Sequence, residues 1–135
     1  MADKYVLDTS AIVSMLRIEP GAERVRDLIL TEKRNIILPW VVLYEIYYLT
    51  MRQVGEAEAK KRYIALRELP VTIIWQEEET YLLAAARIKA SYPLSVADSW
   101  IAAIAKQENG ILVHKDPKME TLGDSVRMEI LPYKK

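Results

Sequence analysis

Short apolar runs alternate with helix-forming segments along this chain, and the alternation restricts the folds that it can adopt. The first four runs are continuously apolar or β-branched, as expected for strands that are covered on both faces. Strands are expected at residues 5–7, 36–38, 71–74, 111–113 and 126–131, the last at a sheet edge because its residues alternate in polarity. The pattern predicts an α/β, single-domain, three-layer fold with a mostly parallel sheet of about five strands flanked by helices.

The segments between the runs carry apolar residues at helical spacing and are bounded by the proline and glycine residues that commonly punctuate helices. Helices are expected at residues 11–16, 22–32, 40–52, 56–69, 77–90 and 94–108, with a short helical turn at 119–122. No repeat or linker interrupts the 135 residues, of which 51% are hydrophobic. Residues 1–135 are therefore expected to form one domain with a substantial core.

Composition excludes several kinds of site. The chain has no cysteine and one histidine. Disulfides, zinc–thiolate sites, iron–sulfur clusters and cysteine nucleophiles are excluded, and a histidine-rich metal site is disfavoured. A metal would have to be held by oxygen ligands. A nucleotide-binding Rossmann domain is also disfavoured, since no expected strand is followed by a G-x-G-x-x-G or Walker-type glycine loop.

Nineteen basic and nineteen acidic residues cancel, so net charge does not indicate a nucleic-acid or membrane partner. If four acids share one site, fifteen remain against nineteen bases, which leaves a surface of about +4 that can accommodate a polyanion. The first residues lack the features of a signal peptide, and no apolar run approaches the length of a membrane span. A cytoplasmic protein without a membrane partner is expected.

Four acids occupy related positions in the expected topology. Asp8 and Asp116 follow strands, Asp98 lies in the first turn of a helix, and Glu45 lies beside the apolar stripe of another. Right-handed βαβ units would place all four at one edge of the sheet. Carboxylates gathered there repel one another unless a cation neutralises them, and oxygen ligands favour Mg²⁺ or Mn²⁺. Such a site can activate water and support phosphodiester hydrolysis.

Each acid also has a plainer explanation, and these alternatives stay open. Asp8 can stabilise helix N–H groups, or the two hydroxyl residues after it can cap the helix instead. Asp98 completes a capping-box-like pattern with Ser95, and Asp116 precedes a proline in a common helix-start arrangement. Glu45 is the hardest to explain by packing, and an ion pair with an arginine is the alternative.

Four stretches of the chain together resemble the PIN-domain nucleases, especially the small VapC-type toxins of prokaryotic toxin–antitoxin pairs. The stretches are residues 6–10, Glu45, residues 94–103 and residues 112–116, and the third, LSVADSWIAA, is the most specific. The resemblance covers essentially the whole chain. It implies a parallel five-stranded sheet, a metal-dependent endoribonuclease that leaves a 5′-phosphate, frequent homodimerisation and inhibition by a cognate antitoxin.

The resemblance also implies roles for individual residues. Asp8 and Asp98 would anchor a Mg²⁺ or Mn²⁺ ion, Glu45 would share or orient it, and Asp116 would help to bind metal or water. Ser10 would support Asp8. RNA is the implied substrate.

Two departures from the family pattern lie near the last aspartate. His114 stands where a hydroxyl residue is common, and we consider the hypothesis that it donates to the scissile phosphate. The aromatic residue that commonly follows the aspartate is absent, and Met119 is expected to fill its pocket. Arg17, Lys115 and Lys118 are the basic residues expected near the site edge, where they could hold the RNA backbone.

Two alternatives remain at this stage. The acids could serve only packing and caps, which would make the protein a non-catalytic protein- or RNA-binding module of the same fold. The protein could instead be a housekeeping nuclease in RNA processing, which shares the chemistry and differs in substrate. The tyrosines at residues 44, 47 and 48, with Met51, are interpreted as core and packing surface, or as a subunit contact, rather than as platforms for base stacking.

Overall fold

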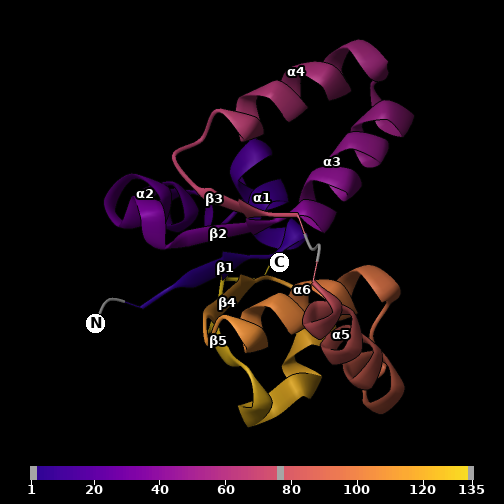
Figure 1. Ribbon diagram of the computed structural model, residues 1–135. Helices are drawn as coiled ribbons and strands as arrows, with labels where there is room; N and C mark the ends of the chain where they lie inside the picture. The colour runs from indigo at the N-terminus through magenta and orange to yellow at the C-terminus, as the bar shows by residue number, and fades with distance from the viewer. Residues whose placement is uncertain (1–2, 76–77, 134–135) are drawn as a thin grey trace.

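A computed structural model describes residues 3–75 and 78–133 and shows a five-stranded sheet with the order β3-β2-β1-β4-β5 (Figure 1). All four strand pairs are parallel. The strands are β1 (Tyr5–Leu7), β2 (Ile36–Pro39), β3 (Thr72–Ile74), β4 (Ile111–His114) and β5 (Arg127–Ile130). The predicted fold class is confirmed, and β5 lies at a sheet edge as expected.

Helices follow the strands in the predicted order. They are α1 (Thr9–Leu16), α2 (Ala22–Glu32), α3 (Trp40–Gln53), α4 (Glu56–Arg67), α5 (Glu79–Ser91) and α6 (Val96–Gln107). Two 3₁₀ segments complete the set: η1 (Lys33–Asn35), which the sequence analysis did not anticipate, and η2 (Pro117–Ser125), where a helical turn was expected. The expected start of the fifth helix, residue 77, lies outside the described residues. No helix in the described part of the chain is long and apolar enough to cross a membrane.

The order in which the strands are added to the sheet changes direction between β1 and β4, in the middle of the sheet. From β1 to β3 the chain moves outward in one direction, and right-handed crossovers keep α1 to α4 on one face. The return from β3 to β4 brings α5 and α6 to the other face, where α6 packs against β1, β4 and η2 (Figure 1). The segments that follow β1 and β4 therefore diverge to opposite faces. Open α/β sheets bind ligands at the carboxyl edge of such a point.

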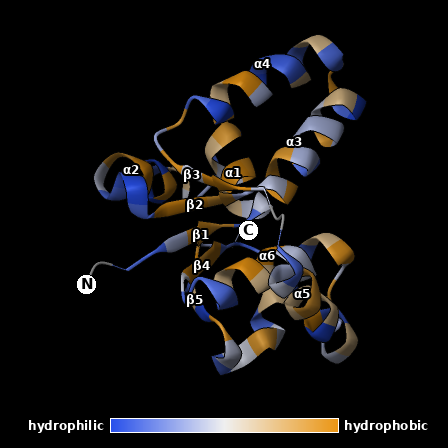
Figure 2. Cartoon of the chain, in the orientation of Figure 1, coloured by the Kyte–Doolittle hydropathy of each residue, from blue (hydrophilic) through white to orange (hydrophobic). Residues whose placement is uncertain are grey.

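The central strands form the core. Residues of β2 are buried throughout, and the side chains of Val6, Leu7 and Leu112 in β1 and β4 are fully buried. Figure 2 shows hydrophobic residues along these strands and hydrophilic residues on α4. The edge strands β3 and β5 are only partly buried. Burial on both faces explains why the runs in the central strands are continuous rather than alternating.

A close approach at Gly110 fixes the pairing of β1 with β4. Ile111 N donates to Lys4 O at 2.8 Å, and Asp8 N donates to Val113 O at 3.0 Å at the other end of the pair. A Cβ atom at Gly110 would lie 2.9 Å from Val6 Cγ2, closer than packed atoms normally come. Glycine at this position therefore lets the two strands meet in the register that places Asp8 beside the exit of β4.

We predict that Gly110→Ala destabilises the fold by about 1–3 kcal/mol, the usual range for an overpacked core site, in a urea unfolding experiment. Val6→Ala removes the opposing methyl group, so the same glycine substitution should be less destabilising in a Val6→Ala background. An equal effect of the substitution in both backgrounds would contradict the assigned contact.

Candidate functional site

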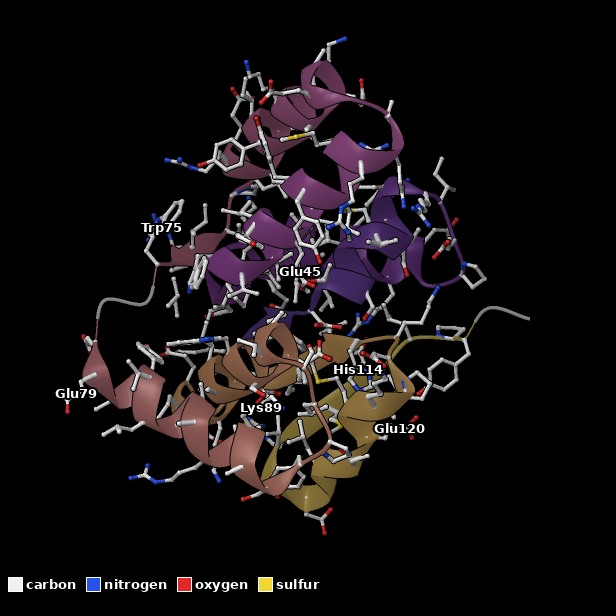
Figure 3. All side chains as sticks on the ribbon, turned by 90° about the vertical axis from the view of Figure 1, so that its right-hand side faces the viewer. Glu45, Trp75, Glu79, Lys89, His114 and Glu120 are labelled. Atoms are coloured by element: carbon white, nitrogen blue, oxygen red, sulfur yellow. The ribbon has the colours of Figure 1, made fainter. Side chains whose placement is uncertain are left out.

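A cleft of about 490 Å³ opens at the carboxyl edge of the sheet. It contains all four acids that the sequence analysis placed at one edge, Asp8, Glu45, Asp98 and Asp116. They come from the end of β1, from α3, from the first turn of α6 and from the residue before η2. Figure 3 looks onto this side of the molecule, with Glu45 near its centre. The topology therefore gathers carboxylates that are far apart in the sequence.

Asp8 is the most buried of these acids, with 2% of its surface exposed. Its Oδ2 accepts hydrogen bonds from Ser10 Oγ at 2.5 Å and from Ser10 N at 3.3 Å. Its Oδ1 is buried without a hydrogen-bond partner, the only such side-chain atom among the described residues. A buried carboxylate oxygen without a partner is costly, and a bound cation would remove that cost.

Asp8 also caps α1. Its side chain accepts the Ser10 backbone N–H, and α1 begins at Thr9, directly after it. The sequence pattern favoured Thr9 and Ser10 as the capping residues, and this prediction is wrong because both lie inside α1 and Asp8 directly precedes it. The Ser10 hydroxyl accepts a hydrogen bond from Lys115 N at 2.8 Å while donating to Asp8. Ser10 thus ties Asp8 to the chain that leaves β4.

Glu45 is half-buried on α3, and its Oε1 accepts a 2.6 Å hydrogen bond from Thr9 Oγ1. The ion pairs within residues 3–75 and 78–133 do not include Glu45, so the alternative of an arginine partner is not found there. The sequence analysis gave Thr9 no such role. Its contact depends on how α3 packs beside α1, which the local sequence does not reveal.

Asp98 and Asp116 combine a capping position with a place in the cleft. Ser95 Oγ accepts the Asp98 N–H at 3.1 Å, as in the predicted capping-box-like pattern. Asp116 Oδ1 accepts the Lys118 N–H at 3.0 Å at the start of η2. Both residues thus take part in helix starts, as the alternatives proposed. Both carboxylates still line the cleft.

Burial and mutual repulsion shift the titration of the cleft acids. Burial raises the pKa of Asp8 to about 7, opposed by the Ser10 hydrogen bonds and increased by repulsion from Asp98. Burial also raises the pKa of Glu45, opposed by Thr9 and increased by Asp98 and Asp116. These shifts indicate a site whose negative charge is incompletely compensated by the protein itself.

The donor set suits a hard divalent cation, because all four acids offer carboxylate oxygens and Asp8 Oδ1 has no other partner. Within the described residues, no three acidic, histidine or cysteine side chains stand close enough together to hold a metal ion by themselves. Mg²⁺ commonly uses only one or two carboxylates and completes its shell with water and substrate oxygens. The side chains of the cleft fit such an ion.

His114 is fully buried and does not line the cleft. Its Nδ1 accepts the Asp116 N–H at 3.0 Å, and its Nε2 lies 3.3 Å from Met128 Sδ. Burial lowers the pKa of His114, which favours the neutral ring. Both ring nitrogens are thus engaged inside the fold, and this geometry does not favour the hypothesis that His114 donates to the scissile phosphate. Met119 is fully buried, in keeping with the expected pocket-filling role.

The three basic residues expected at the site edge lie in different surroundings. The Lys115 side chain is nearly buried, and its ammonium group lies 3.9 Å from Glu19 Oε1. The same group donates a hydrogen bond to the backbone carbonyl of Pro20, before α2. Arg17 lies outside the cleft and donates to Gln53 at 2.8 Å. Lys118 lines the cleft and is exposed. Lys118 is thus the best placed of the three to meet an anionic ligand.

Glu19 is a fifth acid in the cleft that the sequence analysis missed. The residues Glu19, Pro20 and Gly21 indicated only a break between helices. The short α1–α2 connection brings Glu19 Oε1 within 3.9 Å of Lys115 Nζ, directly after β4, and no local sequence pattern predicts that placement.

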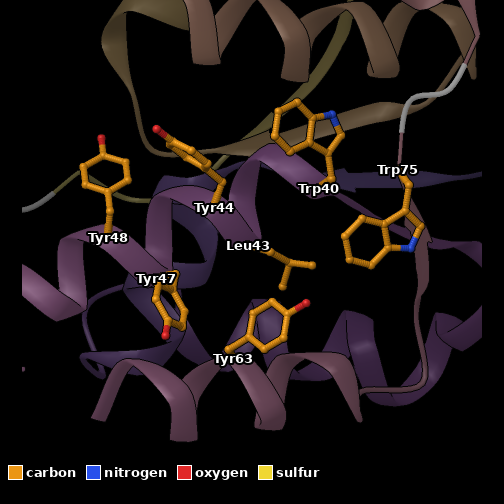
Figure 4. A pocket seen from close by; sticks show the side chains of 7 residues that line it. All are labelled: Trp40, Leu43, Tyr44, Tyr47, Tyr48, Tyr63 and Trp75. Atoms are coloured by element: carbon orange, nitrogen blue, oxygen red, sulfur yellow. The ribbon is translucent and has the colours of Figure 1, made fainter. Parts of the chain in front are cut away.

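A second hollow of about 360 Å³ is separate from the acidic cleft and lies between α3, α4 and the end of β3 (Figure 4). Its lining is aromatic apart from one leucine: Trp40, Leu43, Tyr44, Tyr47, Tyr48, Tyr63 and Trp75. Tyr44 packs edge-on against Trp40 and Tyr48, with ring centroids 6.2 and 5.4 Å away. Tyr44 and Trp75 are 61% and 48% exposed, so this aromatic groove is a surface rather than core.

A family model described as PIN domain matches residues 5–124. Among solved structures, DNA-bound VapBC from Salmonella typhimurium aligns with a TM-score of 0.75 and 17% identity, over 96% of this chain and 98% of the other. VapC20 from Mycobacterium tuberculosis, described as a sarcin–ricin loop cleaving toxin, aligns with a TM-score of 0.73 and 16% identity, over 96% and 100%.

VapBC-1 from nontypeable Haemophilus influenzae aligns with a TM-score of 0.70 and 21% identity, over 93% of this chain and 96% of the other. At these identities the structures establish a shared fold. No curated protein matches the chain.

The raised pKa of Asp8 predicts how the metal-free protein responds to pH. Asp8 titrates near 3.8 when unfolded and near 7 when folded, so between these values the folded state holds more protons and stability falls as pH rises. Asp8→Asn removes this loss. In the presence of a chelator, the variant should gain stability over the wild type from pH 4 to pH 8, by up to about 4 kcal/mol.

Melting temperatures across this pH range, with Asp124→Asn as a control at an exposed acid outside the cleft, would measure the difference. A difference between Asp8→Asn and wild type that does not change with pH would contradict the assigned burial of charge.

Proposed function

The chain belongs to the PIN domain family, and from this premise we propose that it is a Mg²⁺- or Mn²⁺-dependent endoribonuclease that hydrolyses RNA phosphodiester bonds. The observation that carries the proposal is the unpartnered, buried Oδ1 of Asp8 in a cleft with four further carboxylates. Folded proteins rarely keep a buried carboxylate oxygen without a hydrogen-bond partner, whereas a cation site needs an oxygen that is free to bind the ion. The family and the donor set thus support the same chemistry.

In this proposal Asp8 and Asp98 hold the cation, Glu45 shares or orients it, and Asp116 helps to bind the ion or its water. Repulsion from Asp98 contributes to the raised pKa of Asp8, so the two carboxylates are close enough to act on each other. When bound, Mg²⁺ or Mn²⁺ would polarise the phosphodiester and favour attack by water.

The remaining residues hold and complete the site. The Ser10 hydroxyl fixes the orientation of Asp8, and the Thr9 hydroxyl fixes that of Glu45. Both are short hydrogen bonds to carboxylates, which restrict rotation of the acid side chains. Lys118 at the cleft is proposed to bind a substrate phosphate, as a positively charged group beside four acids.

We further propose that the protein is the cytoplasmic toxin of a toxin–antitoxin pair, with a cognate antitoxin and a second copy of the chain as partners. The VapBC neighbours support the first part through their fold. Exposed apolar side chains on α3, just after β3, and on α5 and α6 support a protein partner: Tyr44, Trp75, Leu82, Leu83 and Val96. Isolated exposed apolar residues are ordinary, but a group of this size beside an aromatic groove favours an interface.

A non-catalytic module remains the second candidate, because Asp8 and Asp116 each cap a helix and Asp98 donates its backbone N–H to the cap residue Ser95, so all three have a structural role. A housekeeping nuclease would share the site and differ in substrate. Assays of cation binding and RNA cleavage distinguish a non-catalytic module from the proposed nuclease. The identity of the cleaved RNA distinguishes a housekeeping nuclease from a toxin.

We predict that Mn²⁺ raises the melting temperature of the wild type and that Asp8→Asn and Asp98→Asn weaken this shift, since only the folded site binds the ion. With total RNA and Mn²⁺, the wild type should generate cleavage ends that are reduced at least about 100-fold in both variants. Mapping these ends identifies the substrate.

Asp124→Asn serves as the matched control, because it removes an exposed carboxylate that does not line the cleft. The control should behave as the wild type in both assays. Full activity of folded Asp8→Asn or Asp98→Asn protein would refute the proposed site.

A further inference from the structure

The single histidine of the chain occupies an unusual place, fully buried at the last position of β4 and two residues before Asp116. The proposed function gives it no contact with substrate or metal. Buried polar side chains are retained where they satisfy specific partners. The question is what His114 satisfies.

Both ring nitrogens have partners that define one tautomer. The Asp116 N–H can only donate, so Nδ1 accepts it at 3.0 Å and carries no proton. The proton is then on Nε2, which lies 3.3 Å from Met128 Sδ, a weak acceptor on the neighbouring strand β5. The ring is therefore held from β5 on one side and holds the Asp116 backbone on the other.

After β4 the chain leaves the sheet, and side-chain atoms accept the hydrogen bonds of its backbone N–H groups. Lys115 N donates to Ser10 Oγ at 2.8 Å, Asp116 N to His114 Nδ1 at 3.0 Å, and Lys118 N to Asp116 Oδ1 at 3.0 Å. These bonds determine the backbone of the turn that presents the Asp116 carboxylate. An unsatisfied N–H at this half-buried position would favour rearrangement of the turn.

We propose that His114 is a positioning residue whose Nδ1, by accepting the Asp116 N–H, fixes the Asp116 carboxylate in the cleft for cation and substrate. The effect of His114 on cation binding and RNA cleavage rests on the proposed function. The hydrogen bond and the tautomer are properties of the protein alone, so they can be tested whether or not RNA is cleaved.

Two substitutions of similar polarity separate the roles of the ring nitrogens. In His114→Asn the amide oxygen takes the position of Nδ1 and accepts the Asp116 N–H. In His114→Gln the amide reaches the position of Nε2, towards Met128, and leaves the Asp116 N–H without its acceptor. Removing a residue that supports a metal ligand typically weakens metal affinity about 10- to 100-fold.

We expect His114→Gln to weaken Mn²⁺ binding, measured by calorimetry, about 10-fold or more, and His114→Asn to stay within about 3-fold of wild type. Turnover of RNA should follow the same order. Hydrogen exchange of the Asp116 amide should accelerate in the glutamine variant and remain slow in the asparagine variant. Equal affinities of the two variants would overturn the proposal.

The untagged wild type offers a test that needs no variant, since its one imidazole gives unambiguous long-range ¹H–¹⁵N signals. A proton on Nε2 with an accepting Nδ1 supports the proposal, and a proton on Nδ1 overturns it. Should the wild type cleave no RNA, the nuclease assignment fails alone, while the tautomer and the Asp116 amide still decide the role of His114.

Discussion

The organisation of the cleft depends on the burial of one carboxylate, that of Asp8, at the carboxyl end of β1 and beside β4. Asp8 N continues the β1–β4 pairing by donating to Val113 O, so its side chain cannot move away from the exit of β4. One carboxylate oxygen is held by Ser10, and the other is buried without a partner. A buried oxygen without a partner lowers the stability of the fold. Such costs are common at sites where a bound ligand supplies the missing partner.

The same residues serve the fold and the cleft. Asp8, Ser95 and Asp116 satisfy backbone donors at the start of α1, α6 and η2. Because every helix in a parallel α/β sheet begins at the carboxyl edge, capping side chains collect where ligands bind. Helix capping and cation binding are therefore compatible uses of an acid at this edge. Glu45 differs, since it lies within α3, caps no helix and is held by the hydroxyl group of Thr9.

The fold was predictable because its central strands are buried on both faces, which leaves continuous apolar runs in the sequence. The gathering of Asp8, Glu45, Asp98 and Asp116 followed from topology, without knowledge of side-chain positions. The contacts of Thr9 and the placement of Glu19 were missed, because they depend on how neighbouring helices pack. The engagement of His114 inside the fold was not anticipated for a related reason: its ring turns towards β5, and a local sequence does not indicate which way a residue at a strand exit points.

The central claim is that the free oxygen of Asp8 binds a divalent cation. Crystals of the wild-type protein grown with Mn²⁺ would test it directly, because anomalous scattering locates the ion independently of the protein atoms. We expect an anomalous peak within about 2.5 Å of Asp8 Oδ1, with further ligands from Asp98 or water. A cleft without such a peak at saturating Mn²⁺, or an ion bound elsewhere while Asp8 Oδ1 stays unligated, would contradict it.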